Sequence, residues 1–271
     1  MTDSRPMART SLKWSMIEDD LSIADKFKLV ADLGFDGVEL DAPNDLPLDA
    51  VLAARDAAGI AIPGVINSAH WKTPLTDPDP AVRGACVEAT IIALQQAKAY
   101  GADTVLLVPG VVKGETSYAA AWDRAVEGID RILPHAEEIG VSLALENVWN
   151  DFLLSPLEAA HLIDGFDSPR LGWYFDIGNV MRYGRPSDWI EALGPRILKL
   201  DAKEYSLSKM NAEGPWKGFD VELGEGDIDW AGVNLALGKI GYSGWVSVEV
   251  PGGDRQRLAD IKQRLDRIVS L

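Results

Sequence analysis

Four apolar runs in this chain end on a carboxylate. The runs are VSLALE, LGWYFD, ILKLD and GWVSVE, and their last residues are Glu146, Asp176, Asp201 and Glu249. Carboxylate oxygens are the ligands that hard divalent cations prefer, so such a set suits Mg²⁺ or Mn²⁺ better than Zn²⁺ or Cu²⁺. Four carboxylates brought together would repel one another without a cation between them. If the runs are neighbouring parallel strands, the sequence predicts a divalent-metal site where they end.

Each of these acids also has a structural explanation when it is taken alone. An acid at a strand end can cap the next helix, face solvent, or pair with a lysine such as Lys199 or Lys203. However, an acid stands at the end of each of four successive apolar runs, and this repeated placement favours one shared site. We therefore predict that Glu146, Asp176, Asp201 and Glu249 bind one cation.

Other polar side chains near strand ends are candidates for contact with a substrate. His70, in VINSAHWK, follows the third apolar run, where it can donate a hydrogen bond or carry a proton. The other two histidines, His135 and His161, fall inside predicted helices and are expected to be structural. The lysines that could contact substrate oxygens or a phosphate are Lys13, Lys72 and Lys203, although no glycine-rich phosphate-binding loop accompanies them.

Tryptophans near the same strand ends point to a sugar as substrate. An indole face can stack on the apolar face of a sugar ring, although the same side chains can also serve only for packing. The four candidates are Trp14, Trp71, Trp149 and Trp216, whereas Trp173 lies within a strand and is expected in the core.

The elements that must position these residues follow a repeating order of helix, glycine and apolar run. Glycine directly after a helix can adopt the left-handed conformation that ends it. The glycines in this position are Gly34, Gly59, Gly101, Gly140, Gly194 and Gly241. The predicted strands are SLKWSM, GVEL, IPGVIN, TVLLV, VSLALE, LGWYFD, ILKLD and WVSVEV. The predicted helices cover residues 22–33, 47–58, 79–100, 117–139, 156–164, 186–193, 229–239 and 254–270.

Eight strands alternating with helices predict an α/β protein with a single (β/α)8 TIM barrel. The length of 271 residues fits one such domain over residues 1–271, and no Gly/Ser-rich linker divides the chain. A doubly wound open sheet is the alternative, but no Gly-x-Gly-x-x-Gly motif follows the first strand. Residues 202–228 carry no predicted helix and are expected to form a long loop over the barrel mouth.

Composition limits the partners and the compartment. A formal net charge of −16 argues against nucleic acid as a partner, because proteins that bind nucleic acid present a basic surface to its phosphates. The sequence has no apolar run long enough to cross a membrane and no secretory signal in MTDSRPMARTSLKW, so we expect no membrane partner. One cysteine, Cys86, excludes an internal disulfide, and we expect it to pack inertly in a cytoplasmic protein.

Six short motifs, in this order, resemble the xylose isomerase-like TIM barrel family, which includes sugar isomerases, sugar epimerases and relatives of endonuclease IV. The motifs are GFDGVEL with Glu39, LALEN with Glu146, DIGN with Asp176, LDAKE, GEGDIDW and SVEV with Glu249. The resemblance implies that Glu146, Asp176 and Glu249 are three of the family's metal ligands. It leaves a homo-oligomer open, since acidic barrels of this family are often oligomers.

The chain departs from the family pattern at two positions. The family usually reads Asp-x-Gly-His after strand six and His-x-Lys-Asp after strand seven, where this chain has Asn179 and Asp201. A carboxylate in place of a neutral imidazole favours hard cations and should raise the carboxylate pKa values in the absence of a cation. Asn179 can orient a substrate oxygen but cannot shuttle a proton near neutral pH.

These features together predict a divalent-metal-dependent sugar isomerase or epimerase of carbohydrate metabolism. It would act on a ketose or keto-sugar through a metal-stabilised enediolate, with Glu146 and Glu249 as paired acid and base. One alternative is a metal-dependent lyase or hydrolase that cleaves an oxidised glycoside. Another is an inactive sugar-binding barrel subunit. Three histidines are too few for the multi-metal cluster of the endonuclease branch.

Overall fold

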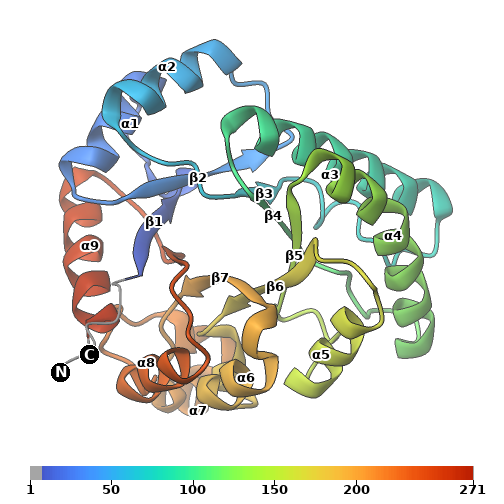
Figure 1. The fold of residues 1–271 in the computed structure, drawn as a ribbon. Helices are drawn as coiled ribbons and strands as arrows, with labels where there is room; N and C mark the ends of the chain where they lie inside the picture. Colours follow the sequence, from blue (N-terminus) through green and yellow to red (C-terminus); the bar gives the residue numbers. More distant parts are fainter. Residues whose placement is uncertain (1–7, 271) are drawn as a thin grey trace.

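The computed structural model describes residues 8–270, which form a closed barrel of parallel strands surrounded by helices (Figure 1). The strands follow chain order around the barrel, and the last pairs with the first. This closure confirms the predicted TIM barrel and excludes the open sheet, which would leave two unpaired edges. The predicted domain over residues 1–271 extends past the described residues at both ends.

Each predicted strand overlaps a strand of the barrel. The strands are β1 (Arg9–Lys13), β2 (Gly37–Ala42), β3 (Val65–Asn67), β4 (Thr104–Leu107), β5 (Ser142–Glu146), β6 (Leu171–Asp176), β7 (Ile197–Ala202) and β8 (Trp245–Val248). The third strand is shorter than predicted because Pro63, which has no N–H to donate, precedes it.

Every predicted helix is present to within one residue at each end. The helices are α1 (Ile23–Asp32), α2 (Leu48–Ala58), α3 (Pro80–Tyr100), α4 (Tyr118–Ile139), α5 (Pro156–Asp164), α6 (Pro186–Leu193), α7 (Leu207–Glu213), α8 (Trp230–Lys239) and α9 (Arg255–Val269). The six glycines expected to follow helices all have a positive φ, between 54° and 82°. Local signals therefore determined where most of the helices end.

The segment after β7 contains the exception, since α7 lies where no helix was predicted. The side chain of Ser206 caps it by accepting a hydrogen bond from the backbone N–H of Lys209. A short 3-10 helix, η4 (Pro215–Phe219), follows. None of the α7 side chains is buried, so its sequence lacks the apolar periodicity on which a prediction depends.

Glu204, directly after β7, holds the rest of this segment in place. Its carboxylate accepts hydrogen bonds from the backbone N–H of Gly224 at 2.7 Å and from Nε1 of Trp230 at 2.9 Å. A side chain at Gly226 would lie 2.5 Å from the same carboxylate. These contacts join the LDAKE segment to the GEGDIDW segment.

On β6, strand alternation separates the side chains that face the helices from those that face the barrel interior. On β6, Trp173 and Phe175 pack on Trp189 of α6, with ring centroids 6.5 and 6.0 Å apart. Tyr174 and Asp176 therefore point inward, because successive residues of a strand face opposite sides. Asp176 is also in register with Asp201 of β7, so the two carboxylates lie at the same level.

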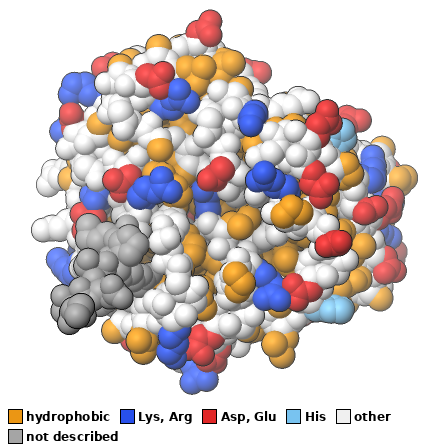
Figure 2. Space-filling model, viewed as in Figure 1, with side chains coloured by type: hydrophobic (Ala, Val, Ile, Leu, Met, Phe, Trp, Pro, Cys, Tyr) orange, Lys and Arg blue, Asp and Glu red, His pale blue; other side chains and the backbone are white. Residues whose placement is uncertain are grey.

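The surface agrees with the composition. On the face shown in Figure 2, outside the grey atoms, lysine and arginine side chains lie among acidic ones rather than in a continuous basic tract. Within residues 8–270, no helix combines the length and the apolar character needed to cross a membrane.

The loops after β6 and β7 touch backbone to backbone at Gly178, which gives a prediction. A Cβ there would lie 2.8 Å from the carbonyl oxygen of Lys203, so Gly178→Ala should lower the free energy of unfolding by about 1–3 kcal/mol. In contrast, nothing lies within 4 Å of a Cβ at Gly238 in α8. Gly238→Ala should therefore raise the free energy of unfolding by about 0.5–1 kcal/mol. Urea unfolding of both variants checks this, and an equal effect of the two would contradict the close contact.

Candidate metal and substrate site

The four carboxylates predicted as metal ligands lie together at the C-terminal end of the barrel. Glu146 ends β5, Asp176 ends β6, Asp201 lies in β7, and Glu249 directly follows β8. One oxygen atom of each residue lies within 4.8 Å of an oxygen of every other. Asp176 and Asp201 are completely buried, whereas the side chain of Glu249 keeps 41% of its exposure. The structure thus brings all four predicted ligands into one carboxylate cluster.

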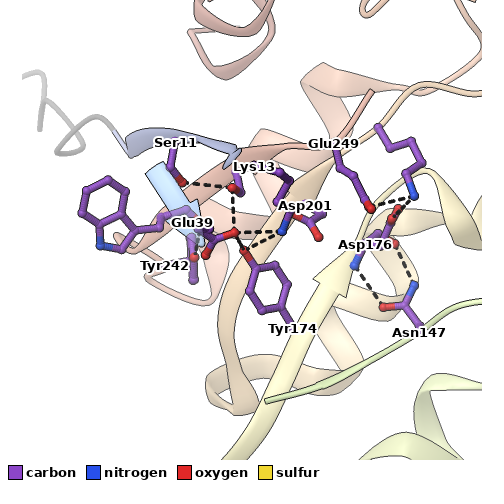
Figure 3. A network of polar contacts seen from close by, with 12 residues as sticks. Ser11, Lys13, Glu39, Asn147, Tyr174, Asp176, Asp201, Tyr242 and Glu249 are labelled. Atoms are coloured by element: carbon purple, nitrogen blue, oxygen red, sulfur yellow. Dashed lines mark hydrogen bonds and ion pairs between the residues drawn. The ribbon is translucent and has the colours of Figure 1, made fainter. Parts of the chain in front are cut away.

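Asn147 positions the end of β6, a role that the sequence analysis missed. Its side-chain oxygen accepts a hydrogen bond from the N–H of Asp176 at 3.0 Å, and its Nδ2 donates to the carbonyl oxygen of Asp176 at 2.7 Å (Figure 3). The N–H of Asn179 donates to Oδ1 of Asp176 at 2.8 Å. The asparagine in LALEN was the available signal.

Two lysines supply positive charge to the carboxylate cluster. Nζ of Lys13 lies 2.8 Å from both Glu39 and Asp201. Nζ of Lys203 lies 2.9 Å from Asp176 and 2.8 Å from Glu249. Both lysines were predicted as possible substrate contacts, and the structure shows them paired with these acids and also in the lining of the cavity described below.

Lys199, which the sequence offered as a partner for the acids, lies elsewhere. Its ammonium is 2.9 Å from Asp103, which precedes β4 at the opposite end of the barrel. Burial alone would lower the pKa of Lys13 and of Lys203, but the neighbouring carboxylates outweigh burial and raise both values. Both ammonium groups therefore stay charged.

Burial sets the pKa values of three of the four acids. It raises the pKa of Asp176 and, together with neighbouring carboxylates, raises the pKa values of Glu146 and Asp201 well above their ordinary range. Glu249 is the exception, since Lys203 and Lys13 outweigh burial and lower its pKa to about 2. The expectation of raised pKa values was therefore wrong for Glu249, because sequence alone did not show its ion pair with Lys203.

The residues present fit a hard divalent cation. Oδ2 of Asp201 is buried and makes no hydrogen bond. When they are ionised, the five acids, Glu39 and the four of the carboxylate cluster, outnumber the two lysines that pair with them, which leaves an excess of negative charge. Oxygen donors and this excess charge are the features that favour Mg²⁺ or Mn²⁺.

A cavity of about 900 Å³ opens above the carboxylate cluster, and Glu146 and Glu249 line it. The other predicted site residues that line it are His70, Asn179, Lys203, Trp71, Trp149 and Trp216. Trp14 does not line it, because it packs on Phe27 of α1 with ring centroids 5.6 Å apart and lies under the ammonium of Lys26. The structure therefore gives no support for Trp14 as a substrate contact.

His70 lines the cavity in a form that can donate a hydrogen bond. Its Nδ1 accepts a hydrogen bond from the N–H of Val108 at 3.3 Å, so the neutral ring carries its proton on Nε2. Burial, only partly offset by Glu249, lowers the pKa of His70 to about 4. Near neutral pH the ring is therefore uncharged, and its Nε2–H is free to donate a hydrogen bond toward the cavity.

An aromatic wall borders one side of the cavity. Trp149 is fixed by a hydrogen bond from its Nε1 to the carbonyl oxygen of Asn179 at 2.8 Å. Trp216 and Phe219 pack on it, with ring centroids 4.6 and 4.9 Å away. Nδ2 of Asn179 donates to the carbonyl oxygen of Asn147 at 2.9 Å, so this amide also holds the loops together. Sequence analysis missed Phe219, which no motif marks.

Lys72, a possible substrate contact, and the three residues that were expected to be structural do not line the cavity. His135 and His161 lie in α4 and α5, as predicted. Cys86 is buried in α3, and burial raises the pKa of its thiol to about 12, which agrees with inert packing.

Comparison with known proteins assigns the family. The sequence pattern of the xylose isomerase-like TIM barrel family matches residues 27–271. The chain belongs to this family. The resemblance inferred from the motifs is thereby confirmed.

Several relatives of this chain are named as sugar epimerases. The putative L-ribulose-5-phosphate 3-epimerase SgbU of Escherichia coli is 28% identical over 243 residues, which cover 85% of this chain and 84% of the relative. A solved D-tagatose 3-epimerase-like protein has a TM-score of 0.80 at 21% identity, with 97% of this chain and 98% of that chain covered. The 3-keto-D-glucoside 4-epimerase YcjR of E. coli has a TM-score of 0.81 at 13% identity, with 97% and 100% covered. The two structural matches support the fold.

The pKa shifts predict a pH-dependent effect of metal on stability. A carboxyl whose pKa rises on folding stabilises the protein at low pH, and this contribution is lost as the pH rises through the folded pKa. Glu146, Asp176 and Asp201 are of this kind. Glu249 acts in the opposite sense, since its contribution is present above the ordinary 4.5 and is lost as the pH falls toward 2.

Mn²⁺ should therefore raise the unfolding temperature more at pH 8 than at pH 5, because it binds deprotonated carboxylates and relieves their repulsion. Thermal unfolding with EDTA and with Mn²⁺ at both pH values measures the difference. Asp201→Asn should reduce the Mn²⁺ effect. An equal Mn²⁺ effect at both pH values would contradict the role of these acids.

Asp201 gives a prediction about which metal the site prefers. Imidazole nitrogen is a softer ligand than carboxylate oxygen, so Asp201→His should shift the preference from Mg²⁺ or Mn²⁺ toward Co²⁺ or Zn²⁺. Calorimetric titration of both proteins with each cation gives the two affinity series. Identical series would show that Asp201 does not touch the metal.

Proposed function

We propose that this protein is a divalent-metal-dependent sugar epimerase or isomerase that acts on a ketose or keto-sugar. The observation that carries the proposal is that Glu146 and Glu249 belong both to the carboxylate cluster and to the lining of the cavity. The naming of relatives as sugar epimerases supports the same reaction class. The substrate would be a small sugar that enters at the C-terminal end of the barrel.

The residues that would hold the metal are Glu146, Asp176, Asp201 and Glu249. A bound Mn²⁺ or Mg²⁺ would supply a Lewis acid that polarises the substrate carbonyl and stabilises the negative charge formed next to it. Asn147 and Lys203 keep Asp176 oriented toward the carboxylate cluster. His70 would donate a hydrogen bond from Nε2 to a substrate oxygen.

Glu146 and Glu249 would move the proton. They come from β5 and from the end of β8, so they approach the cavity from different sides of the barrel. One carboxylate would remove the proton from the carbon next to the carbonyl, and the other would return it. Return from the opposite face inverts that carbon, which is epimerisation.

Replacing either glutamate with glutamine should remove proton transfer while keeping the side-chain volume. We expect Glu146→Gln and Glu249→Gln to lower kcat by about 10²–10⁴-fold. The readout is incorporation of solvent deuterium next to the carbonyl of a ketose, followed by NMR with Mn²⁺ present. Glu191→Gln, which alters an exposed ion pair with Lys239, is the matched control and should keep full activity.

Unfolding temperatures and circular dichroism establish that each variant is folded. Activity of either site variant within twofold of wild type would end the acid–base assignment. A lyase would use the same carboxylates to remove the proton and then release a second molecule, so mass analysis of the products separates the two reactions.

A further inference from the structure

The cavity is larger than a free ketose needs, and its mouth carries two exposed indoles. Its volume of about 900 Å³ lies near the top of the range of about 300–1,000 Å³ in which drug-sized ligands bind. Trp71 and Trp216 both line it and keep 54% and 69% of their exposure. Large apolar side chains exposed around one cavity indicate a surface that a ligand covers.

The two indoles stand on opposite sides of the mouth. Trp71 follows β3 and Trp216 follows β7, and these strands are four places apart in either direction around the closed barrel. The two indoles therefore reach the mouth from different parts of the barrel.

Packing and hydrogen bonds hold the residues around Trp216 in place. Trp216 packs on Trp149, whose Nε1 is bonded to the backbone of the loop after β6. The hydroxyl of Tyr205 donates to the carbonyl oxygen of Pro215 at 2.7 Å, next to Trp216. A stacking surface fixed in this way loses little conformational entropy when a ligand binds.

The charge of the lining disfavours a phosphorylated substrate. Among the described residues that line the cavity, the only cationic side chains are Lys13 and Lys203, and each is paired with two carboxylates. Arg182 lies over the Trp149 ring at 4.9 Å but is not part of the lining. The acids of the lining are Asp41, Glu146, Glu204, Asp220 and Glu249. Within this lining, a phosphate would meet carboxylates, and the two lysines present are already paired with acids.

We propose that the substrate is an uncharged glycoside of a keto-sugar. The ring that bears the carbonyl lies at Glu146 and Glu249, and the second ring, a sugar or an aromatic aglycone, lies at the mouth that Trp71 and Trp216 line. This inference rests on the proposed epimerase function and adds the substrate class. Such a substrate would differ from the phosphorylated ketose for which the relative SgbU is named.

Two matched pairs of ligands test the proposal by calorimetric titration of the Mn²⁺-loaded protein. Phenyl and methyl β-glucoside differ only in the second moiety, and we expect the phenyl compound to bind about threefold to tenfold more tightly. L-Ribulose 5-phosphate and L-ribulose differ only in the phosphate, and we expect the phosphate to weaken binding.

Variants locate the effect at the mouth. Trp216→Ala and Trp71→Ala should each reduce the preference for the phenyl compound to within about twofold. Leu235→Ala removes an exposed apolar side chain from α8 that does not line the cavity, and it should keep the wild-type preference. Equal binding of the two glucosides by wild type, an unchanged preference in both tryptophan variants, or tighter binding of the phosphate would overturn the proposal.

A turnover experiment separates this inference from the proposed function. It compares the keto form of phenyl β-glucoside with L-ribulose 5-phosphate. Deuterium incorporation into phenyl 3-keto-β-glucoside, faster than into L-ribulose 5-phosphate, supports both. Faster incorporation into L-ribulose 5-phosphate supports the epimerase and overturns the glycoside. No incorporation into any ligand, with the expected binding preferences intact, supports the glycoside site and overturns the epimerase.

Discussion

The carboxylates of Glu39, Glu146, Asp176, Asp201 and Glu249 lie in one poorly solvated end of the barrel. Like charges repel one another far more strongly there than in water. Two ammonium groups offset part of this repulsion, while burial, together with the neighbouring carboxylates, raises the pKa values of Glu146, Asp176 and Asp201. The need for further positive charge is the physical reason to place a divalent cation in this site.

The same constraint shapes the barrel interior below the site. Oε2 of Glu39 accepts hydrogen bonds from the hydroxyls of Tyr174 at 2.7 Å and Ser247 at 2.9 Å, and it pairs with Lys13 (Figure 3). Burial would raise the pKa of Glu39, but Lys13 and Lys199, together with the hydrogen bond from Tyr174, outweigh burial and lower the value. Glu39 therefore keeps its charge, and with Lys13 it forms a polar support under Asp201.

Above the site, the segment after β7 connects the acids to the aromatic wall. Lys203 pairs with the acids, Glu204 accepts hydrogen bonds from residues as far along the chain as Trp230, and Trp216 reaches the cavity mouth. One short segment thus carries a counterion, a structural anchor and a stacking surface. A change in its position would alter the charge and the shape of the cavity together.

The sequence determined the barrel because strands, helices and their glycine ends are set by nearby residues. It also determined that four acids meet, because parallel strands of a barrel end at the same mouth. It did not reveal α7, which buries no side chain. Only the tertiary structure decided that Lys13 and Lys203 pair with the acids, that Trp14 faces α1, and that His70 stays neutral. These outcomes depend on distances between residues far apart in the chain, which no local pattern encodes.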